Sequence, residues 1–337
     1  MIIACAAAIT LAVIFRPIAK SPTVEESELT WDRDPVASAA VGQVEGRPVV
    51  VTGDLDGMVR VWDLATRQLV GKPMTGHTSI VSSVTVAQVD GRSIAVTLSV
   101  DGTMRVWDLA THQQVGEPMN GHNGNMAAVG QLKGRTVIVT GGADGAVRVW
   151  DLATRRPVGE PITGDTVESV SAVAVTQVKG RAVVITGGRN ETVRVWDLAT
   201  RRLVGKPMIG HTNSLEAIAL GQVGGRRVIV TGGSDDSVRL WDLTTHHLLG
   251  QLPGHADAVY AVAIAQVDGR PIAVTGDLKG TVRLWDLTTL RLLGKPATGH
   301  TDAVKTIAVT QVDGRQVAVT VDDDYRMRVW DLPAIPR

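Results

Sequence analysis

Histidine is the side chain in this sequence best suited to acid–base chemistry near neutral pH. Five of the eight histidines directly follow a glycine: His77, His122, His211, His255 and His300. With a hydroxyl and a carboxylate within reach, such a histidine could act as the base of a nucleophilic triad. An active site is needed only once, however, whereas the Gly-His dipeptide recurs along the chain. The repetition therefore indicates a structural role for these five histidines.

The remaining histidines offer little to a metal or a cofactor. His112, His246 and His247 fall in expected loops, and the adjacent pair has no evident third ligand. Cys5 is the single cysteine, which excludes an internal disulfide and a cysteine-based zinc site. The sequence has neither a phosphate-binding glycine loop nor an isolated carboxylate pair. We therefore expect no catalytic residue, no bound metal and no cofactor.

Composition narrows the class of partner. Lys plus Arg and Asp plus Glu both number 34, so the net charge of zero gives no overall attraction to nucleic acid or to an anionic membrane. Aromatic residues make up only 3% of the chain, and stacking aromatics for single-stranded nucleic acid are absent from the expected loops. Small and β-branched residues dominate, which favours β-sheet. Nucleic-acid binding is therefore not expected.

A Trp-Asp dipeptide sets the period of the chain. All eight tryptophans precede aspartate, and seven of these pairs are separated by 43 to 46 residues. The seven tryptophans are Trp62, Trp107, Trp150, Trp196, Trp241, Trp285 and Trp330. Trp31 lies only 31 residues before Trp62 and is out of phase. Regular self-similarity of this kind indicates a repeat architecture, here with seven units.

Each unit reads as four strands. In the unit 76–119, alternating residues lead to an Asp-Gly hairpin signal at 90–91, and a second tight turn follows. The expected strands span 81–89, 93–98, 103–109 and 113–119. A proline recurs in the last strand of the units, which belongs at a sheet edge because proline cannot donate to a ladder. These prolines are Pro73, Pro118, Pro161, Pro207, Pro253 and Pro296.

Over about residues 24–332 these units resemble the WD40-repeat family. The resemblance rests on seven in-register Trp-Asp pairs together with the Gly-His, hairpin and turn signals. It implies an all-β fold, a seven-bladed β-propeller whose four-stranded blades place the fourth strand outermost. The proline positions agree with that order.

The first and last units are expected to share a blade. Aligning Gly46 with Gly91 places Trp31-Asp32 in the Gly-His position of the first blade. The last unit ends after its third strand, and the resemblance implies that residues 23–29 supply the fourth strand and close the ring. Closure removes two open sheet edges. We therefore expect a hydrophobic N-terminal segment at 1–20, a propeller at 23–332 and a C-terminal tail at 333–337.

The resemblance also implies a hydrogen-bonded tetrad within a blade, formed by the Gly-His histidine, a second-strand threonine, a turn aspartate and the tryptophan. Blades two, three, five and seven carry complete sets: His77, Thr97, Asp101 and Trp107; His122, Thr140, Asp144 and Trp150; His211, Thr231, Asp235 and Trp241; His300, Thr320, Asp324 and Trp330. Blade one has Asp32 at the histidine position, and blade six has Lys279 at the aspartate position. Blade four has Asp165 and Asn190 there, and we expect it to be the softest blade.

Loops on opposite faces of such a propeller carry opposite charges. The hairpins between first and second strands each contain an arginine: Arg47, Arg92, Arg135, Arg181, Arg226, Arg270 and Arg315. The opposite face carries aspartates outside the expected tetrads: Asp54, Asp236, Asp257, Asp277, Asp302, Asp322 and Asp323. The arginines either pair locally with the Trp-Asp and hairpin carboxylates or form a docking face for an acidic or phosphate-bearing partner.

Positions where near-identical repeats differ are candidates for partner contact. By resemblance to the family, one such position faces the top surface around the central channel: Ala37, Ser82, Ala127, Ser171, Glu216, Tyr260 and Lys305. Three neighbouring blades supply an acid, an aromatic ring and a base there, and Tyr260 could anchor a contact. Exposed apolar residues at a second variable position, namely Leu55, Val100 and Leu278, are further candidates. Drift after duplication is the alternative explanation for both sets.

The N-terminal residues 2–15 form an apolar run in which Thr10 is the one residue with a hydroxyl group. As a helix this run would reach roughly 21 Å, short of a hydrocarbon core of about 30 Å. Three interpretations remain open: a weak membrane anchor, a cleaved signal, or the truncated end of a membrane helix from a longer multidomain protein. Arg16 and Lys20 follow the run, which favours a cytoplasmic propeller if the segment inserts. A cleaved signal would instead make the propeller secreted.

These observations favour a non-catalytic scaffold or sensor that binds other proteins, built on a monomeric propeller. Rigid blades would hold the binding loops in fixed geometry, so that little ordering entropy is lost on binding. The alternatives are a propeller-based enzyme or small-ligand binder acting at the central channel, or a regulatory fragment of a larger protein. An enzyme would need a unique titratable cluster on the innermost strands, where only Glu216 and Lys305 stand out.

Overall fold

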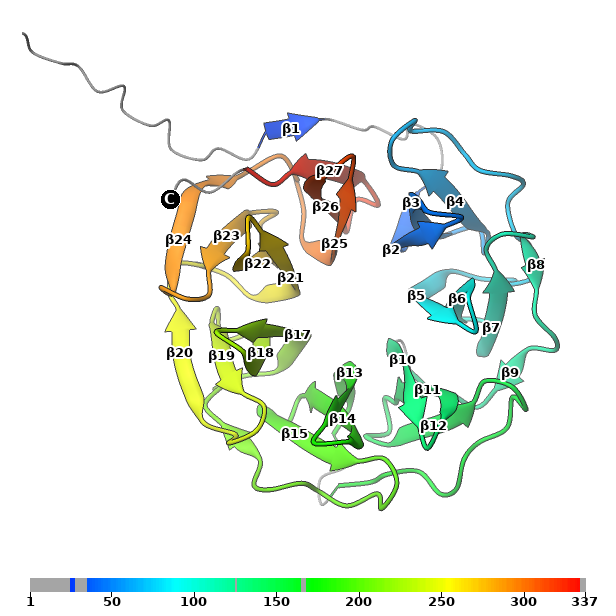
Figure 1. The fold of residues 1–337 in the computed structure, drawn as a ribbon, viewed down its shortest axis with the longest axis horizontal. Coiled ribbons are helices and arrows are strands. Elements are labelled where there is room, and N and C mark those ends of the chain that lie inside the picture. Colours follow the sequence, from blue (N-terminus) through cyan, green and yellow to red (C-terminus); the bar gives the residue numbers. More distant parts are fainter. Residues whose placement is uncertain (1–24, 28–34, 125, 165–167, 334–337) are drawn as a thin grey trace, which may run out of the picture.

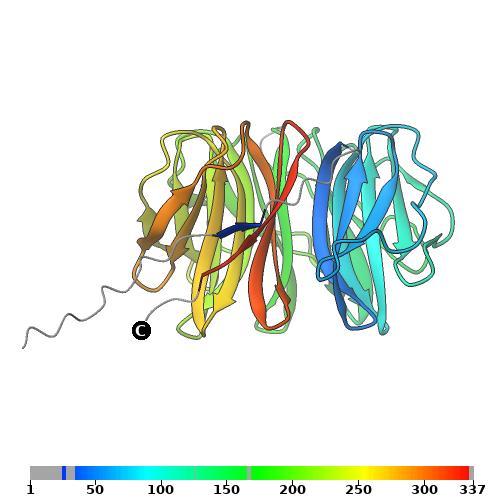
Figure 2. The ribbon, with the colours of Figure 1, turned by 90° about the horizontal axis from the view of Figure 1, so that it is seen from above.

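The computed structural model describes residues 25–27, 35–124, 126–164 and 168–333. Its regular elements within those ranges are all β-strands. They form seven antiparallel sheets that stand around a central axis (Figure 1). Seen from the side, the strands run between two opposite faces of the ring (Figure 2). The prediction of an all-β, seven-bladed propeller is confirmed.

The innermost strand of each blade lines the centre of the ring (Figure 1). In blade order these strands are β2 (Val36–Val44), β5 (Val81–Val89), β10 (Met126–Leu132), β13 (Val170–Val178), β17 (Leu215–Val223), β21 (Val259–Val267) and β25 (Val304–Val312). Each turns back into the second strand through a two-residue hairpin. In blade two the hairpin residues Asp90 and Gly91 both have positive φ, the type I′ geometry that matches the twist of the flanking strands.

The second and third strands form the middle of each blade. The second strands are β3 (Arg47–Asp54), β6 (Arg92–Ser99), β11 (Arg135–Gly141), β14 (Arg181–Gly188), β18 (Arg226–Gly233), β22 (Arg270–Asp277) and β26 (Arg315–Asp322). The third strands are β4 (Val59–Asp63), β7 (Thr103–Asp108), β12 (Val147–Asp151), β15 (Thr192–Asp197), β19 (Val238–Asp242), β23 (Val282–Asp286) and β27 (Met327–Asp331). We call the face with the turns between second and third strands the top face, and the opposite face the hairpin face.

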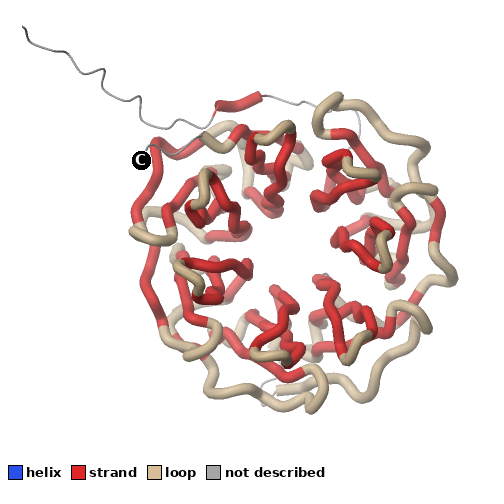
Figure 3. The backbone as a smooth tube through the Cα atoms, viewed as in Figure 1, coloured by secondary structure: helices blue, strands red, loops and turns tan. Residues whose placement is uncertain are grey.

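The outer edge is the least regular part of the blades (Figure 3). Its strands are β1 (Glu25–Ser27), β8 (Gln113–Gln114), β9 (Met119–Asn120), β16 (Met208–Ile209), β20 (Leu248–Leu252) and β24 (Arg291–Ala297). In blades one and three the outer segment makes isolated bridges only. The N-terminal strand β1 pairs antiparallel with β27, so residues from the two ends of the chain share the last blade.

The core lies between neighbouring blades. One cluster joins Val51 of blade one to Val81 and Trp107 of blade two, and another joins Val36 of blade one to Val319 of blade seven. The second strands are apolar on both sides because each sheet packs against two neighbours, which is why they read as continuous β-branched runs. This packing holds the ends of the innermost strands in place around the channel.

Candidate functional site

β-Bulges set the side chains at the mouth of the central channel. In six blades the pairing of the innermost with the second strand skips one residue close to the top face. The skipped residues are Ala37, Ser82, Ser171, Glu216, Tyr260 and Lys305. A bulge leaves one residue unpaired and re-aims its side chain. Six of the seven positions expected at the channel entrance are therefore bulged residues.

Ala127 is the exception, and its expected placement needs correction. It pairs with Thr140, the register position that Val84 holds opposite Thr97 in blade two. The Gly-His and hairpin glycines are 13 residues apart in blade three, at 121 and 134, but 15 apart in blade two, at 76 and 91. The shorter segment carries no bulge, so Ala127 corresponds to Val84 and lies two residues further along its strand than the bulged residues of the other blades. Counted back from the hairpin glycine, the residue of blade three that aligns with Ser82 is Asn125, which lies outside the described ranges.

A cavity of about 270 Å³ opens at this mouth. Five of the bulged residues line it: Ala37, Ser82, Glu216, Tyr260 and Lys305. Its walls continue into the channel with polar side chains, among them Ser83 and Thr85, with Met126, and with branched apolar side chains such as Ile218 and Ile307. Ser171 does not line the cavity, whereas Ala127 does from its deeper position. The variable positions are thus brought together in space.

Charge is confined to one side of the mouth. The ammonium nitrogen of Lys305 lies 4.0 Å from the centre of the Tyr260 ring and 3.2 Å from a carboxylate oxygen of Asp323. Glu216 accepts a hydrogen bond of 2.8 Å from the hydroxyl of Ser234. Among the described residues Glu216 forms no ion pair. Blades one and two contribute the uncharged residues Ala37 and Ser82 to the same cavity.

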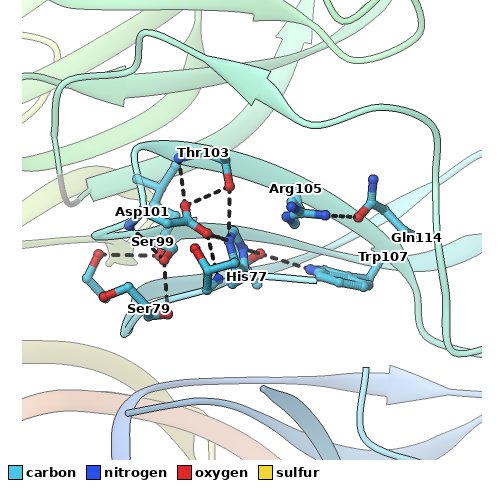
Figure 4. Close-up of polar contacts among 12 residues, drawn as sticks. His77, Ser79, Ser99, Asp101, Thr103, Arg105, Trp107 and Gln114 are labelled. Carbon is cyan, nitrogen blue, oxygen red and sulfur yellow. Dashed lines mark hydrogen bonds and ion pairs between the residues drawn. The ribbon is translucent and has the colours of Figure 1, made fainter. Parts of the chain in front are cut away.

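The tetrad histidines lie inside the blades rather than at the mouth of the channel. In blade two, His77 Nδ1 lies 3.0 Å from Asp101, and Nε2 lies 2.8 Å from Thr97 Oγ1 (Figure 4). Trp107 Nε1 donates to the same threonine oxygen at 2.8 Å. Blade five repeats this tetrad with His211, Thr231, Asp235 and Trp241.

The indole N–H of Trp107 can only donate, and this fixes the direction of the other hydrogen bonds in the tetrad. Because the indole N–H donates to Thr97 Oγ1, the threonine hydroxyl can donate to His77 Nε2, and the Nδ1–H then donates to Asp101. Burial lowers the pKa of His77, which keeps the ring neutral. Burial disfavours ionisation of Asp101, but hydrogen bonds from Thr103 and Thr78 hold its pKa well below the usual value. No hydroxyl in this chain of bonds is free to act as a nucleophile.

Blades six and seven take their carboxylate from a different position than expected. His255 Nδ1 lies 2.8 Å from Asp277, and His300 Nδ1 lies 2.7 Å from Asp322. Asp324, the expected partner in blade seven, accepts a hydrogen bond from Thr301 instead. Asp277 and Asp322 stand two residues after the tetrad threonine, at the end of the strand, rather than four residues after it in the turn. Blade six therefore has a complete tetrad despite Lys279.

Blade three lacks the tetrad that its sequence predicts. His122 Nδ1 bonds to the carbonyl of Gly124 at 2.8 Å, and Asp144 pairs with Arg148. Trp150 still donates to Thr140. The shortened segment before the innermost strand accounts for this, because it turns His122 toward its own loop. The sequence shows that this segment is two residues shorter than in blade two, but it does not show which contact is lost as a result.

Blades one and four differ from the rest. In blade one Arg60 pairs with Asp54 and Asp56. Burial raises the pKa of Asp54 to about 7, although the Arg60 guanidinium opposes this. In blade four Trp196 donates to Thr186, and Asn190 accepts from the backbone of Thr192. Asp32 and Asp165, which stand in the histidine positions of these blades, lie outside the described residues.

Comparison with known proteins decides the family. The family model for the WD domain, G-beta repeat, matches residues 68–108, 113–151, 203–242, 246–286 and 292–331, more than half of the chain. The chain belongs to the WD40 family. A search of curated proteins gave no match. WD40 propellers generally bind other proteins and generally serve as non-catalytic scaffolds.

The Trp-Asp aspartates of this WD40 propeller cap its outer loops. Asp242 accepts from the backbone N–H groups of Thr244 and Thr245, each at 2.8 Å. Three of these carboxylates also face a hairpin arginine: Asp151 with Arg135, Asp286 with Arg270, and Asp331 with Arg315. These three arginines are therefore paired locally and do not form part of an unpaired basic face.

The acidic character expected of the top face is weaker than the sequence suggested. Asp54, Asp277 and Asp322 are buried and bonded to Arg60, His255 and His300, so they contribute little charge to the surface. Asp257 pairs with Lys279. The top face does carry apolar side chains in its turns. Val100 is 61% exposed and Leu278 41%, while Leu55 is half-buried.

Two of the loop histidines pack against the preceding blade. His112 packs against Gly71 of blade one, and His246 packs against Gly205 of blade four. His246 Nδ1 also lies 3.2 Å from the carbonyl of Lys206. Arg155 and Arg201 occupy the same position against Gly116 and Gly159.

Within the described residues no group of three His, Cys, Asp or Glu side chains could hold a metal.

Helices that could cross a membrane are absent from the described ranges. The apolar residues 2–15 lie outside those ranges.

Proposed function

We propose that this WD40 propeller is a docking platform for another protein and that the partner binds at the channel mouth on the top face. One observation supports this most strongly. Six β-bulges place residues at a variable position of the repeats close to the top face, and five of these residues line one cavity. Bulges are over-represented beside functional sites because they re-aim a side chain at the expense of a ladder bond.

The surroundings of the mouth suit a protein partner better than a substrate. Exposed Val100 and Leu278 lie in turns on the same face, and apolar side chains next to polar ones are typical of protein interfaces. A platform built from mutually packed blades also loses little conformational entropy when it binds.

Affinity capture from the source cells tests the proposal. The full chain is used as bait beside a variant with Glu216→Ala, Tyr260→Ala and Lys305→Ala, both checked for folding by circular dichroism. We expect a protein that the wild-type chain retains and the triple variant loses.

A matched control changes the opposite face. Arg181→Ala combined with Arg226→Ala removes two hairpin side chains and leaves the mouth intact. Retention by this control supports binding at the top face. Loss with the control and retention by the triple variant would overturn the proposal and place docking on the hairpin face.

A further inference from the structure

We propose that the channel mouth selects a basic side chain, arginine or lysine, presented by a segment of the partner protein. The proposal rests on the docking function proposed above and names the chemistry of its ligand. The cation would pair with the carboxylate of Glu216 and lie against the ring of Tyr260.

Glu216 is the charged group at the mouth that has no described counter-ion. Its one polar contact among the described side chains is the hydrogen bond from Ser234, which fixes the carboxylate but does not neutralise it. Lys305, the one cationic residue among the six bulged positions, pairs with Asp323 and Tyr260 instead. Of the two charged side chains that line the cavity, only Lys305 is paired, so the Glu216 carboxylate has no cationic partner there. A cation from a partner would supply the counter-ion that the Glu216 carboxylate lacks.

Tyr260 offers the second half of the site. Its ring attracts cations, since Lys305 Nζ lies 4.0 Å from the ring centre, and a cation from the partner would have to use the face or edge that Lys305 leaves open. Tyr260 occupies the same bulge position in blade six that Glu216 occupies in blade five. The carboxylate and the ring therefore reach the cavity from adjacent blades at the same depth.

The size and lining of the cavity limit what enters it. About 270 Å³ accommodates one long side chain rather than a folded element. The small residues Ala37 and Ser82 also line the cavity and leave room for an aliphatic stem. Lysine and arginine both combine such a stem with a charged head. An acidic side chain would meet the uncompensated Glu216 carboxylate and be disfavoured.

A display library of random short peptides, selected against the full chain, tests this inference. We expect the selected peptides to share an arginine or lysine at one position. Their affinity for the Glu216→Gln variant should fall about tenfold or more, because a charge-assisted bond is lost in a partly desolvated site. Glu216→Lys should reverse the preference toward acidic peptides.

Asp236→Asn is the matched control. It removes the same charge from the same blade and the same face, it does not line the cavity, and asparagine tolerates the positive φ of that turn. Selected peptides should bind this variant as they bind the wild-type chain.

Three results separate the inference from the docking function. Peptides that lose affinity for Tyr260→Ala but carry no shared basic residue would overturn the inference and leave docking at the mouth intact. Peptides with equal affinity for wild type, Glu216→Gln and Tyr260→Ala would overturn both. A basic consensus weakened equally by Asp236→Asn and Glu216→Gln would show general attraction to the acidic turns and would also overturn the inference.

Discussion

The interior of the blades repeats one set of polar residues, whereas the mouth of the channel changes its residues from blade to blade. Inside blades two, five, six and seven, a histidine, a threonine, an aspartate and a tryptophan repeat with nearly the same hydrogen-bond distances. At the mouth, the bulged residues differ between blades, and Glu216, Tyr260 and Lys305 each occur in a single blade, although blades two and four both carry serine. A network that every blade needs stabilises the fold, whereas a feature present once can recognise a partner.

The deviations among the tetrads support this distinction. Blade seven offers two aspartates and uses Asp322, and blade six uses Asp277 where Lys279 occupies the turn. The carboxylate can thus come from either of two backbone positions provided that it reaches the histidine. Such tolerance suits a structural bond, because its partner need only satisfy a buried donor. A catalytic group would have to keep its position relative to a substrate.

The largest expected contrast comes from Trp241→Ala and Glu216→Ala, both in blade five. Trp241 is buried and donates to Thr231, so its truncation should lower the free energy of unfolding by about 3–5 kcal/mol. Glu216→Ala removes one exposed-rim hydrogen bond and should cost about 1 kcal/mol or less. Urea denaturation of the full chain measures both. Similar losses in the two variants would contradict the division between interior and mouth.

A smaller contrast is expected between two Gly-His histidines, one inside a tetrad and one outside. His255→Ala leaves Asp277 and Thr275 without their buried partner, which should cost about 1–3 kcal/mol. His122→Ala loses a bond to one loop carbonyl and should cost less, because blade three has no assembled tetrad. Thermal unfolding of both variants provides the comparison. A His122 variant as unstable as the His255 variant would show that blade three holds a tetrad after all.

The smallest expected effect is a dependence of stability on pH. Burial lowers the pKa of His77 and His211 below the ordinary value of 6.5, so the unfolded chain binds protons that the folded chain does not. Their contribution is complete above about pH 6.5 and is lost as the pH falls below that value. Asp54, whose pKa burial raises to about 7, acts in the opposite direction between its ordinary value of 3.8 and 7.

Comparing wild type with a His77→Gln and His211→Gln double variant isolates the histidines, since Asp54 is common to both. Denaturant unfolding from pH 7.5 to pH 5 should show the wild-type chain losing stability more steeply than the variant. Parallel curves would mean that these histidines do not titrate differently in the folded and unfolded chains.

Much of the fold could be predicted from the sequence because its signals are local and repeated. The Trp-Asp period gave seven units, and the out-of-phase Trp31 together with the missing last strand predicted the pairing now seen between β1 and β27. The bulges were not foreseen, but their residues were found as positions where the repeats differ. Repetition makes such positions visible even without knowledge of their geometry.

The remaining features depend on contacts that sequence spacing does not reveal. Asp277 and Asp322 stood two residues from the expected position, and only the path of the turn decides which carboxylate reaches the histidine. Counting from the apolar residue of blade three, rather than from its hairpin glycine, misplaced Ala127. The packing of His112 on Gly71 joins two blades, and no pattern within one repeat predicts it.

Site-specific photo-crosslinking in the source cells tests the central claim most directly. A photoreactive residue at position 82 lies in the cavity at the mouth, and one at position 181 lies on the hairpin face. The account predicts a crosslinked partner protein from position 82 and none from position 181. Adducts from position 181 alone would contradict it, because the partner would then bind the face opposite to the bulged residues.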